Sequence, residues 1–342
     1  MKQLVLIVDY KNNFGSKWKS NPYRSGLDKQ YLIKLFNERN ITVHVKKYSE
    51  ICIEDTFWAD KWVLYNSSED FGLYYKSFIE DIILGLQLKG AKLLPRFDLL
   101  RAHENKVFME IIRQIVIPES HRTILSYSFG TLEEAIDIIN SERISFPCIL
   151  KRADGAMSKG VFLIKEYKDL IKVIRRFGKT ITLKQWIFEC VRSYKYKGYT
   201  KESRFQKKFI IQPFIPGLEN DWKVLIYGKK VFVLKREVRK GDFRASGSGV
   251  NYVTGSDSGF PAQFLDFIYE FYKYLNTPSV SIDFAFDGKK PYIFEFQSIG
   301  FGTSTHQKSR DYYEKTTEGW IIKENHFDQE SLFVQSIVDF IT

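Results

Sequence analysis

The 342-residue sequence predicts a mixed fold, α/β over its first hundred residues and α+β over the rest. In the first region short apolar segments alternate with segments of helical spacing, which is the pattern of a parallel sheet. The predicted strands are 4–8, 41–45 and 62–65, and the predicted helices are 27–39 and 74–88. Later strands follow one another through tight turns, as 222–227 and 231–237 do, which is the pattern of antiparallel sheets.

Composition narrows the class of protein. The chain has 52 Lys and Arg against 41 Asp and Glu, a net charge of +11, which favours anionic ligands such as nucleotides, acidic sugars or nucleic acid. Its three cysteines (Cys52, Cys148 and Cys190) are scattered and form neither a disulfide framework nor a metal-binding spacing. The apolar run at 4–8 is too short for a signal peptide or a membrane span. We therefore expect a cytoplasmic protein without a membrane span.

A loop rich in Gly, Ser and Lys lies between two predicted strands. The strand 146–152 (FPCILKR) leads into the loop 153–160, and the strand 161–164 follows at once. Such a loop can fold over phosphate groups, because it offers backbone N–H groups and an ammonium group. Glycine-rich turns between strands are common, so the loop also fits a plain hairpin.

The segment 179–208, here called the basic insertion, mixes cationic and aromatic side chains. Its basic residues from 192 onward are Arg192, Lys195, Lys197, Lys201, Arg204, Lys207 and Lys208, interleaved with Tyr194, Tyr196 and Tyr199. This mixture fits binding of nucleic acid or of an acidic polymer. It fits equally well a solvated insertion that happens to be rich in lysine.

The segment 281–305 (SIDFAFDGKKPYIFEFQSIGFGTST) reads as two strands joined at Asp287-Gly288. Alternation predicts one apolar face with members from both strands. These are Ile282, Phe284 and Phe286 on the first strand, and Tyr292, Phe294 and Phe296 on the second.

The opposite face of this hairpin carries Asp283, Glu295 and Gln297. With a three-residue loop at 288–290, Asp283 lies directly opposite Glu295. Two facing carboxylates repel one another, so a cation between them is expected, and hard oxygen ligands suit a Mg²⁺ ion that phosphates also hold. A solvated outer face in another register is the alternative.

Taken together, these segments resemble the ATP-grasp superfamily from about Lys106 to Gly302. Its nearest branches by motif are the ribosomal-protein glutamate ligases and the D-alanine–D-alanine ligases. The resemblance implies an ATP-grasp fold of two lobes, preceded by a small Rossmann-like α/β domain. It divides the chain into an N-terminal domain (1–102), a first lobe (103–210) with the basic insertion, and a second lobe (211–342) with the magnesium site and a C-terminal helix.

The resemblance also assigns nucleotide-binding residues. Lysines in HENKVFMEI and PCILKRADG match those that hold the phosphates, the loop after the second lysine matches a lid over the γ-phosphate, and IIQPFIPGLE matches the segment that binds adenine and ribose. The residues so implied are Lys106 and Lys151 for phosphate, Gly155, Ser158 and Gly160 in the lid, Gln212, Pro213 and Ile215 at adenine, and Glu219 at ribose. The family often has Glu where Gln212 stands.

Catalytic and metal residues are implied in the same way. Arg236 in LKRE and Arg244 in FRAS match arginines that face the transferred phosphoryl group, although Ser246 replaces the usual Asn. The metal ligands are Asp283, Glu295 and Gln297, with Gln in place of the usual Asn. Asp221 and Lys223 in NDWKV resemble an Asp-x-Arg pair on the acceptor side, and Lys there loses the bidentate grip of Arg.

The implied activity is that of an ATP-dependent ligase that uses ATP and Mg²⁺, or Mn²⁺ in its place. A substrate carboxylate becomes an acyl phosphate, an amine attacks it, and ADP and phosphate are released. An ATP-grasp kinase that phosphorylates a small molecule or sugar is the alternative, and a nucleotide-binding protein without ligase activity is the second. The expected substrate is an anionic small molecule, peptide or glycan precursor and not a nucleic acid, and a homodimer remains open.

Overall fold

A computed structural model describes residues 2–141, 143–155, 160–238, 244 and 252–342. The chain forms two compact units. Unit 1 joins residues 1–103, 112–123 and 218–342, and unit 2 joins residues 104–111 and 124–217. The predicted mixture of α/β and α+β architecture is confirmed. The three-domain division stays a prediction.

The first sheet of unit 1 has four parallel strands in the order β2-β1-β3-β4, as the alternation of strands and helices predicts. The strands are β1 (Lys2–Val8), β2 (Ile41–Lys47), β3 (Trp62–Leu64) and β4 (Lys92–Leu94). Strand β1 is buried on both faces, because helices cover each side of the sheet. The near-continuous apolar run of β1 is typical of a strand that is buried on both faces in a parallel sheet.

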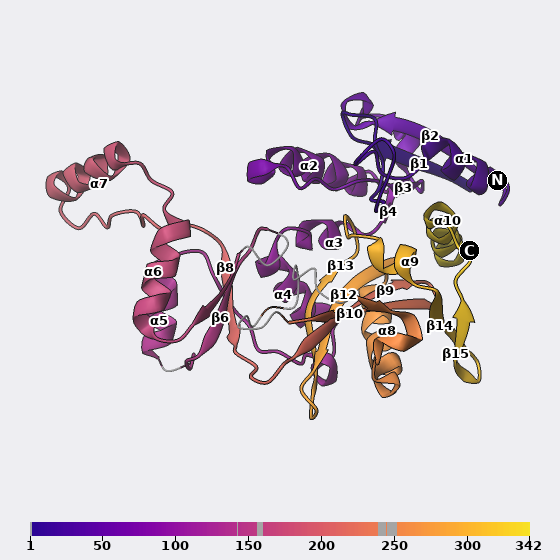
Figure 1. Cartoon of the computed structure of the whole chain (residues 1–342). Coiled ribbons are helices and arrows are strands. Elements are labelled where there is room, and N and C mark those ends of the chain that lie inside the picture. Colours follow the sequence, from indigo (N-terminus) through magenta and orange to yellow (C-terminus); the bar gives the residue numbers. More distant parts are fainter. Residues whose placement is uncertain (1, 142, 156–159, 239–243, 245–251) are drawn as a thin grey trace. The chain divides into compact units, whose positions relative to one another are not determined.

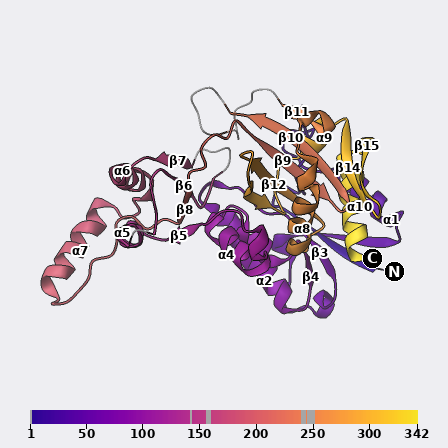
Figure 2. The same ribbon diagram turned by 90° about the horizontal axis from the view of Figure 1, so that it is seen from below.

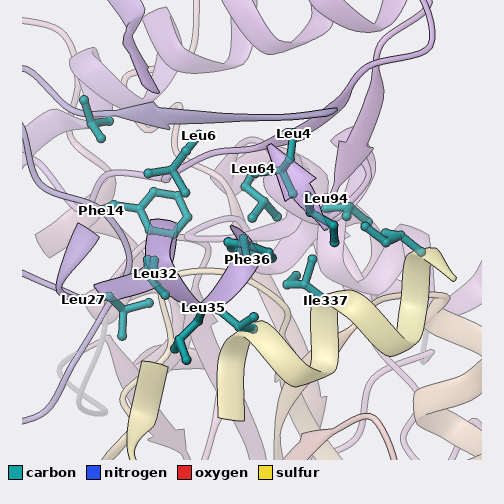
Figure 3. Close-up of a cluster of buried hydrophobic side chains, with 14 residues drawn as sticks. Leu4, Leu6, Phe14, Leu27, Leu32, Leu35, Phe36, Leu64, Leu94 and Ile337 are labelled. Atoms are coloured by element: carbon teal, nitrogen blue, oxygen red, sulfur yellow. The ribbon is translucent and has the colours of Figure 1, made fainter. Parts of the chain in front are cut away.

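Helices cover each face of this sheet. Helices α1 (Lys29–Asn37) and α10 (Gln329–Ile341) pack on the face that carries Leu4 and Leu6. Figure 3 shows Ile337 of α10 in the same cluster as Leu4. Helix α2 (Tyr74–Leu88) packs on the other face, next to the short helix α3 (Phe97–Ala102). The C-terminal helix thus completes the core of the N-terminal sheet.

The second sheet of unit 1 has its strands in the order β13-β12-β9-β10-β14-β15, with β11 paired to β10. The paired strands are antiparallel: β9 (Asn220–Tyr227), β10 (Lys230–Glu237), β11 (Val253–Thr254), β12 (Ser279–Phe286), β13 (Pro291–Gln297), β14 (Asp311–Thr316) and β15 (Gly319–Glu324). Helix α8 (Leu265–Leu275) covers one face, where Phe271 meets Phe296 edge to face (Figures 1 and 2). Helix α9 (Ser304–Lys308) lies near β9 and β10.

The alternation predicted for the second strand of the acidic hairpin is wrong at Tyr292 and Phe294, which precede Glu295, and is confirmed at Phe296. Phe284 pairs with Ile293, because the register shifts by one residue after Asp283. Phe294 is the extra residue of a β-bulge, and a bulge reverses the faces of the residues that follow it. The core therefore receives Ile293 and Phe296, whereas Tyr292 and Phe294 are half-buried and stack on each other with ring centroids 6.4 Å apart.

Unit 2 is built on a four-stranded antiparallel sheet in the order β5-β8-β6-β7. Its strands are β5 (Tyr127–Phe129), β6 (Cys148–Arg152), β7 (Val161–Ile164) and β8 (Phe209–Pro213), and its helices are α5 (Leu132–Asn140), α6 (Tyr167–Gly178) and α7 (Leu183–Lys195). Helices α5 and α6 bury Leu132, Leu170 and Ile174 against the sheet. A capping box opens α5, because Thr131 and Glu134 each bond the other's backbone N–H.

Helix α4 (Lys106–Val116) begins in unit 2, and its last turns belong to unit 1. His103, three residues before α4, ends the separate helix α3 as its C-cap. In the part of the chain that the structure describes, the search for an apolar helix of membrane-spanning length finds none.

Candidate functional site

Charged residues form a row across four strands of the large sheet, here called the charge row. Arg236 on β10 pairs with Asp221 on β9, and Lys223 on β9 pairs with Asp283 on β12. Asp283 in turn lies directly opposite Glu295 on β13. The predicted opposition of the two carboxylates is confirmed, and two cationic side chains extend it.

Arg236 binds two carboxylates at once. Its Nε and Nη2 donate to the carboxylate of Asp221 over 2.6 and 2.8 Å, and Nη2 also lies 3.1 Å from Oδ2 of Asp283. Arg236 is buried, and its planar guanidinium suits this bidentate geometry. The arginine therefore fixes the direction in which the Asp283 carboxylate points.

Burial changes the protonation equilibria of this row. Desolvation raises the pKa of Asp221 to about 6, although the Arg236 guanidinium acts to lower it. Burial also acts to lower the pKa of Arg236, but Asp283 and Asp221 outweigh it and raise that pKa well above its ordinary value. Desolvation lowers the pKa of Lys223, and the nearby Asp283 carboxylate opposes this shift. The arginine thus stays charged and keeps its grip on both carboxylates.

The donor atoms beside Asp283 fit a divalent cation of the Mg²⁺ type. Glu295 lies across the ladder, and Gln297 donates through Nε2 to Oε1 of Glu295 over 3.1 Å. All three side chains are partly exposed, so an ion can reach them. Carboxylate and amide oxygens are the ligands that Mg²⁺ prefers. The chemistry of this donor set agrees with the predicted metal site.

Arg113 is a supporting residue that the sequence did not reveal. It lies in the part of α4 that belongs to unit 1 and donates through Nη1 to the carbonyl oxygen of Ile293 over 2.8 Å. The Thr123 hydroxyl accepts a bond from the N–H of Ile293 over 3.0 Å. These contacts hold the bulge of β13 immediately before Glu295. Lys106, Glu110 and Arg113 follow one another at intervals of four and three residues and are all buried, and this helical spacing of charged residues was the available signal.

The two predicted phosphate lysines lie in unit 2. The N–H of Lys106 donates to the carbonyl of Ala153, two residues beyond Lys151, so the start of α4 is tied to the end of β6. The Lys106 ammonium donates to the carbonyl of Gly155 over 3.1 Å, and the N–H of Gly155 donates to Glu104 over 2.7 Å. The structure thus brings Lys106 to the loop that follows Lys151.

The predicted adenine segment runs along β8 and beyond it. Gln212 is buried, and its amide donates to Glu110 and Ser126 over 3.3 and 3.4 Å. Pro213 is exposed and Ile215 is half-buried. The boundary between the two units falls at Gly217 and Leu218, inside the predicted adenine and ribose segment 210–219.

The remaining residues predicted for the site are found as follows. Glu219 is exposed and Gly160 is buried, with its carbonyl accepting a bond from the N–H of Arg152. Arg244 is half-buried. Ser158 and Ser246 lie outside the described residues.

Unit 1 contains a cavity of about 170 Å³ at the carboxyl ends of its parallel strands. Residues that directly follow β1, β3 and β4 line it, including Asp9 and Ser67, as do residues that follow β13, including Ser298. Arg24 also lines the cavity, and its side chain is exposed. The Ser298 hydroxyl is buried and has no hydrogen-bond partner among the described residues. Carboxyl ends of strands are the usual ligand site of open parallel sheets, so this cavity fits a substrate.

Comparison with known proteins finds a family profile that matches part of the chain. The family profile of the RimK-like ATP-grasp domain matches residues 100–253. This chain contains an ATP-grasp domain. The matched range includes the two lysines, the basic insertion, the adenine and ribose segment and both arginines of the sequence analysis. A search of curated proteins found no significant match to this sequence.

Solved structures share the fold of this chain along its whole length. The D-cycloserine synthetase DcsG is similar with a TM-score of 0.55 at 11% identity, over 99% of this chain and 100% of that one. A RimK domain ATP-grasp protein from Sphaerobacter thermophilus DSM 20745 gives a TM-score of 0.53 at 11% identity, over 98% and 99%. The ATP-grasp ligase PsnB, complexed with a phosphomimetic variant of its minimal precursor, Mg and ADP, gives 0.50 at 11% identity, over 100% and 99%.

The predicted ATP-grasp resemblance and fold are confirmed by these matches. The predicted class, an ATP-dependent carboxylate–amine ligase, agrees with them.

Proposed function

We propose that this chain is an ATP-dependent ligase that joins a substrate carboxylate to an amine and releases ADP and phosphate. One observation carries the proposal: Asp283 and Glu295 face each other across a ladder, and Arg236 orients the first of them. Such a pair of carboxylates is unfavourable in a protein without a cation. In a chain that contains an ATP-grasp domain, the cation that accompanies ATP is the natural occupant.

Asp283, Glu295 and Gln297 would hold Mg²⁺, or Mn²⁺ in its place. Bound ATP supplies the phosphoryl group that converts the substrate carboxylate into an acyl phosphate. The PsnB structure, which contains Mg and ADP, supports this choice of cofactors. Arg113 and Arg236 are positioning residues here, because one holds the backbone before Glu295 and the other holds the Asp283 side chain.

Residues of unit 2 bind the nucleotide in this proposal. Lys106 and Lys151 neutralise phosphate charge, and the loop with Gly155, Ser158 and Gly160 covers it. The backbone near Pro213 and Ile215 binds the adenine edge, and Glu219 is the residue proposed for ribose. Gln212 contributes through its place in β8, because its side-chain amide donates to Glu110 and Ser126.

The charge that develops on the transferred phosphoryl group is assigned to Arg244. The sequence offered Arg236 for the same task, but Arg236 is buried in its ion pairs with Asp221 and Asp283. Preorganised cations aimed at a developing anion are a major source of catalysis. Arg244 is half-buried, so part of its side chain stays accessible.

The cavity of unit 1 is the proposed acceptor pocket. Arg24 at the cavity offers a cation to a carboxylate, and the Ser298 hydroxyl offers a buried hydrogen-bonding group. A volume of about 170 Å³ is below that of pockets for drug-sized ligands. The pocket therefore takes a small acid, or the acidic end of a larger peptide or glycan precursor.

Hydroxylamine trapping tests the ligase assignment. Amino acids, uronic acids and small diacids are first screened, singly and in pools, for ADP release in the presence of Mg²⁺. Each active acid is then incubated with ATP and hydroxylamine, without an amine. An acyl phosphate reacts with hydroxylamine, so a hydroxamate and free phosphate are expected in equal amounts. Hydroxamate should not form when ATP is omitted.

The same experiment distinguishes a kinase. A kinase transfers the phosphoryl group to a hydroxyl or another stable acceptor, so phosphate stays on the product and hydroxamate does not form. That result, at every condition in which ADP is released, would overturn the ligase assignment and leave the nucleotide site intact.

A further inference from the structure

Helix α7 of the basic insertion exposes an apolar stripe. Leu183, Ile187, Val191 and Tyr194 follow one another at intervals of four, four and three residues, so they lie on one face of the helix. Their side chains are between 54 and 95% exposed. Phe188 and Tyr196 beside this stripe are exposed as well. Contiguous exposed apolar side chains mark an interaction surface.

The opposite side of α7 is held by the chain that follows it. Glu189 is buried and accepts bonds from the Tyr199 hydroxyl and the N–H of Glu202 over 2.7 and 3.1 Å. Lys201 and Arg204 lie over the Trp186 ring, at 5.3 and 4.9 Å from its centroid. The helix is thus fixed with its apolar stripe turned outward.

The insertion also has a short, bonded neck. Lys179 forms a β-bridge with Phe205, and the N–H of Thr180 donates to the carbonyl of Arg204 over 3.0 Å. Figures 1 and 2 both show α7 standing away from the sheet of unit 2. The apolar stripe therefore lies on a helix that projects from the sheet of unit 2.

Charge accompanies the stripe. Between residues 179 and 208 there are nine Lys and Arg and two Glu, a net charge of +7 out of +11 for the whole chain. One of the two glutamates, Glu189, is buried and paired with Arg192. Lys184 and Lys195 lie on α7 at the edge of the stripe and are exposed. The partner of this surface must therefore be anionic as well as apolar.

We propose that α7 docks the protein on an anionic lipid surface. An amphipathic helix with an apolar face, flanking lysines and aromatic residues lies in the plane of a bilayer interface and needs no groove. Long lysine side chains reach the headgroups while their stems stay on apolar surface, and tyrosines suit the interfacial layer. A second copy of this chain would bring Lys184 and Lys195 against an identical cationic edge, so self-association through α7 is disfavoured.

This inference goes beyond the proposed ligase activity and does not depend on it. A cytoplasmic location, which the scattered cysteines predict, would place α7 next to the anionic leaflet of a membrane. Docking would then bring the ligase to acidic substrates that are made or held at that surface.

Vesicle flotation of the full chain tests the proposal. Vesicles of phosphatidylcholine are compared with an equimolar mixture of phosphatidylcholine and phosphatidylglycerol. We expect binding to the anionic vesicles only, with an affinity that falls as salt rises. The double variant Ile187→Glu/Val191→Glu should bind at least about tenfold more weakly, because it places charge within the apolar stripe. The matched control is Leu88→Glu, at an exposed leucine of α2, which should bind like the wild type.

A second variant tests the contribution of charge separately, and it keeps the test informative if the first variant misfolds. Lys184→Gln/Lys195→Gln keeps the apolar stripe and should weaken binding by about fivefold for each lysine. Circular dichroism and ADP release should match the wild type for all variants. Failure of the wild type to float with anionic vesicles would overturn the proposal. The proposal would also be overturned if the Ile187→Glu/Val191→Glu variant bound anionic vesicles as tightly as the wild type does. It would be overturned as well if α7 mediated dimers, or bound an acidic polypeptide, while the protein did not bind vesicles.

Discussion

The charge row of the large sheet and the basic insertion are both rich in charge, and they hold it differently. In the charge row, cations and carboxylates are interleaved from β10 to β12, and the row ends in the facing carboxylates Asp283 and Glu295. Arg236 binds Asp221 and Asp283 at once. In the basic insertion one sign dominates, and most of its cations are exposed. Buried ion pairs hold the metal-ligating side chains in position before a metal ion binds. Exposed charges of one sign instead attract a binding partner of opposite charge. The two regions should therefore respond in opposite ways to mutation.

The largest effect is expected at the metal ligands. Glu295→Gln keeps the shape of the side chain and removes the charge that faces Asp283. We expect ADP release to fall by about a hundredfold or more, because outer-shell changes alone cost up to that factor. The unfolding midpoint should not fall, since the change relieves repulsion between the two carboxylates.

The matched control is Glu318→Gln, at an exposed turn residue of the same unit. It should retain wild-type activity. Full activity of Glu295→Gln at saturating Mg²⁺ would remove the metal assignment.

The second effect concerns stability. Arg236→Met leaves Asp221 buried without its bidentate partner. Removing one member of a buried ion pair costs about 3–5 kcal/mol, so urea unfolding should show a loss of that size. The exposed pair of Lys34 and Glu38 serves as the comparison, and Lys34→Met should cost about 0.5 kcal/mol or less. If Arg236→Met is as stable as Lys34→Met, the charge row does not hold the sheet together.

The third effect separates phosphate binding from adenine binding. Lys151→Ala should weaken ATP binding by on the order of tenfold, because it removes a charge-assisted bond to phosphate. Adenosine has no phosphate and should bind equally well to the variant and the wild type. Isothermal titration of both ligands measures the difference. Parallel losses for ATP and adenosine would assign Lys151 a structural role.

The acidic hairpin illustrates how far local sequence can go. The Asp287-Gly288 turn and the alternation before it were enough to place Asp283 opposite Glu295. The bulge at Phe294 was not predictable, because Arg113 bonds the carbonyls on both sides of it from a helix about 180 residues earlier. The place of α10 was missed for the same reason. Its apolar face is visible in sequence, but its partner strand is β1 at the other end of the chain.

Helix α7 was missed although its signals are local. Thr182 and Gln185 form a capping box, and the stripe from Leu183 to Tyr194 has helical spacing. The many lysines drew the interpretation towards a solvated or polymer-binding segment instead. Apolar residues at helical spacing therefore predict an amphipathic helix in a basic segment, even where the apolar face of that helix does not pack against a core.

The smallest effect is expected at His306, a buried side chain that is neutral, in contrast to the buried charges of the charge row. His306 is buried, and its Nδ1–H donates to Oε1 of Gln329 over 3.0 Å. Burial lowers the pKa of His306 below its ordinary value, although Gln329 and the nearby Asp328 act to raise it. The folded protein thus holds this histidine neutral over a pH range in which the unfolded chain has begun to protonate it. Stability from His306 is therefore present above the unfolded pKa, near 6.5, and is lost as the pH falls through the folded pKa.

Urea unfolding between pH 5 and pH 8 checks this sign. The free energy of unfolding of the wild type should decrease on acidification, with a contribution from His306 of at most about 1.4 kcal/mol per pH unit. In His306→Gln that contribution should vanish, and the curve should flatten between about pH 5 and pH 6.5. The exposed His326 is the control, because His326→Gln should keep the wild-type slope. An unchanged slope in His306→Gln would show that His306 is as easily protonated in the fold as in water. The protein would then tolerate an unpaired charge at the buried position of His306. Burial alone would no longer explain why the buried charges of the charge row are paired.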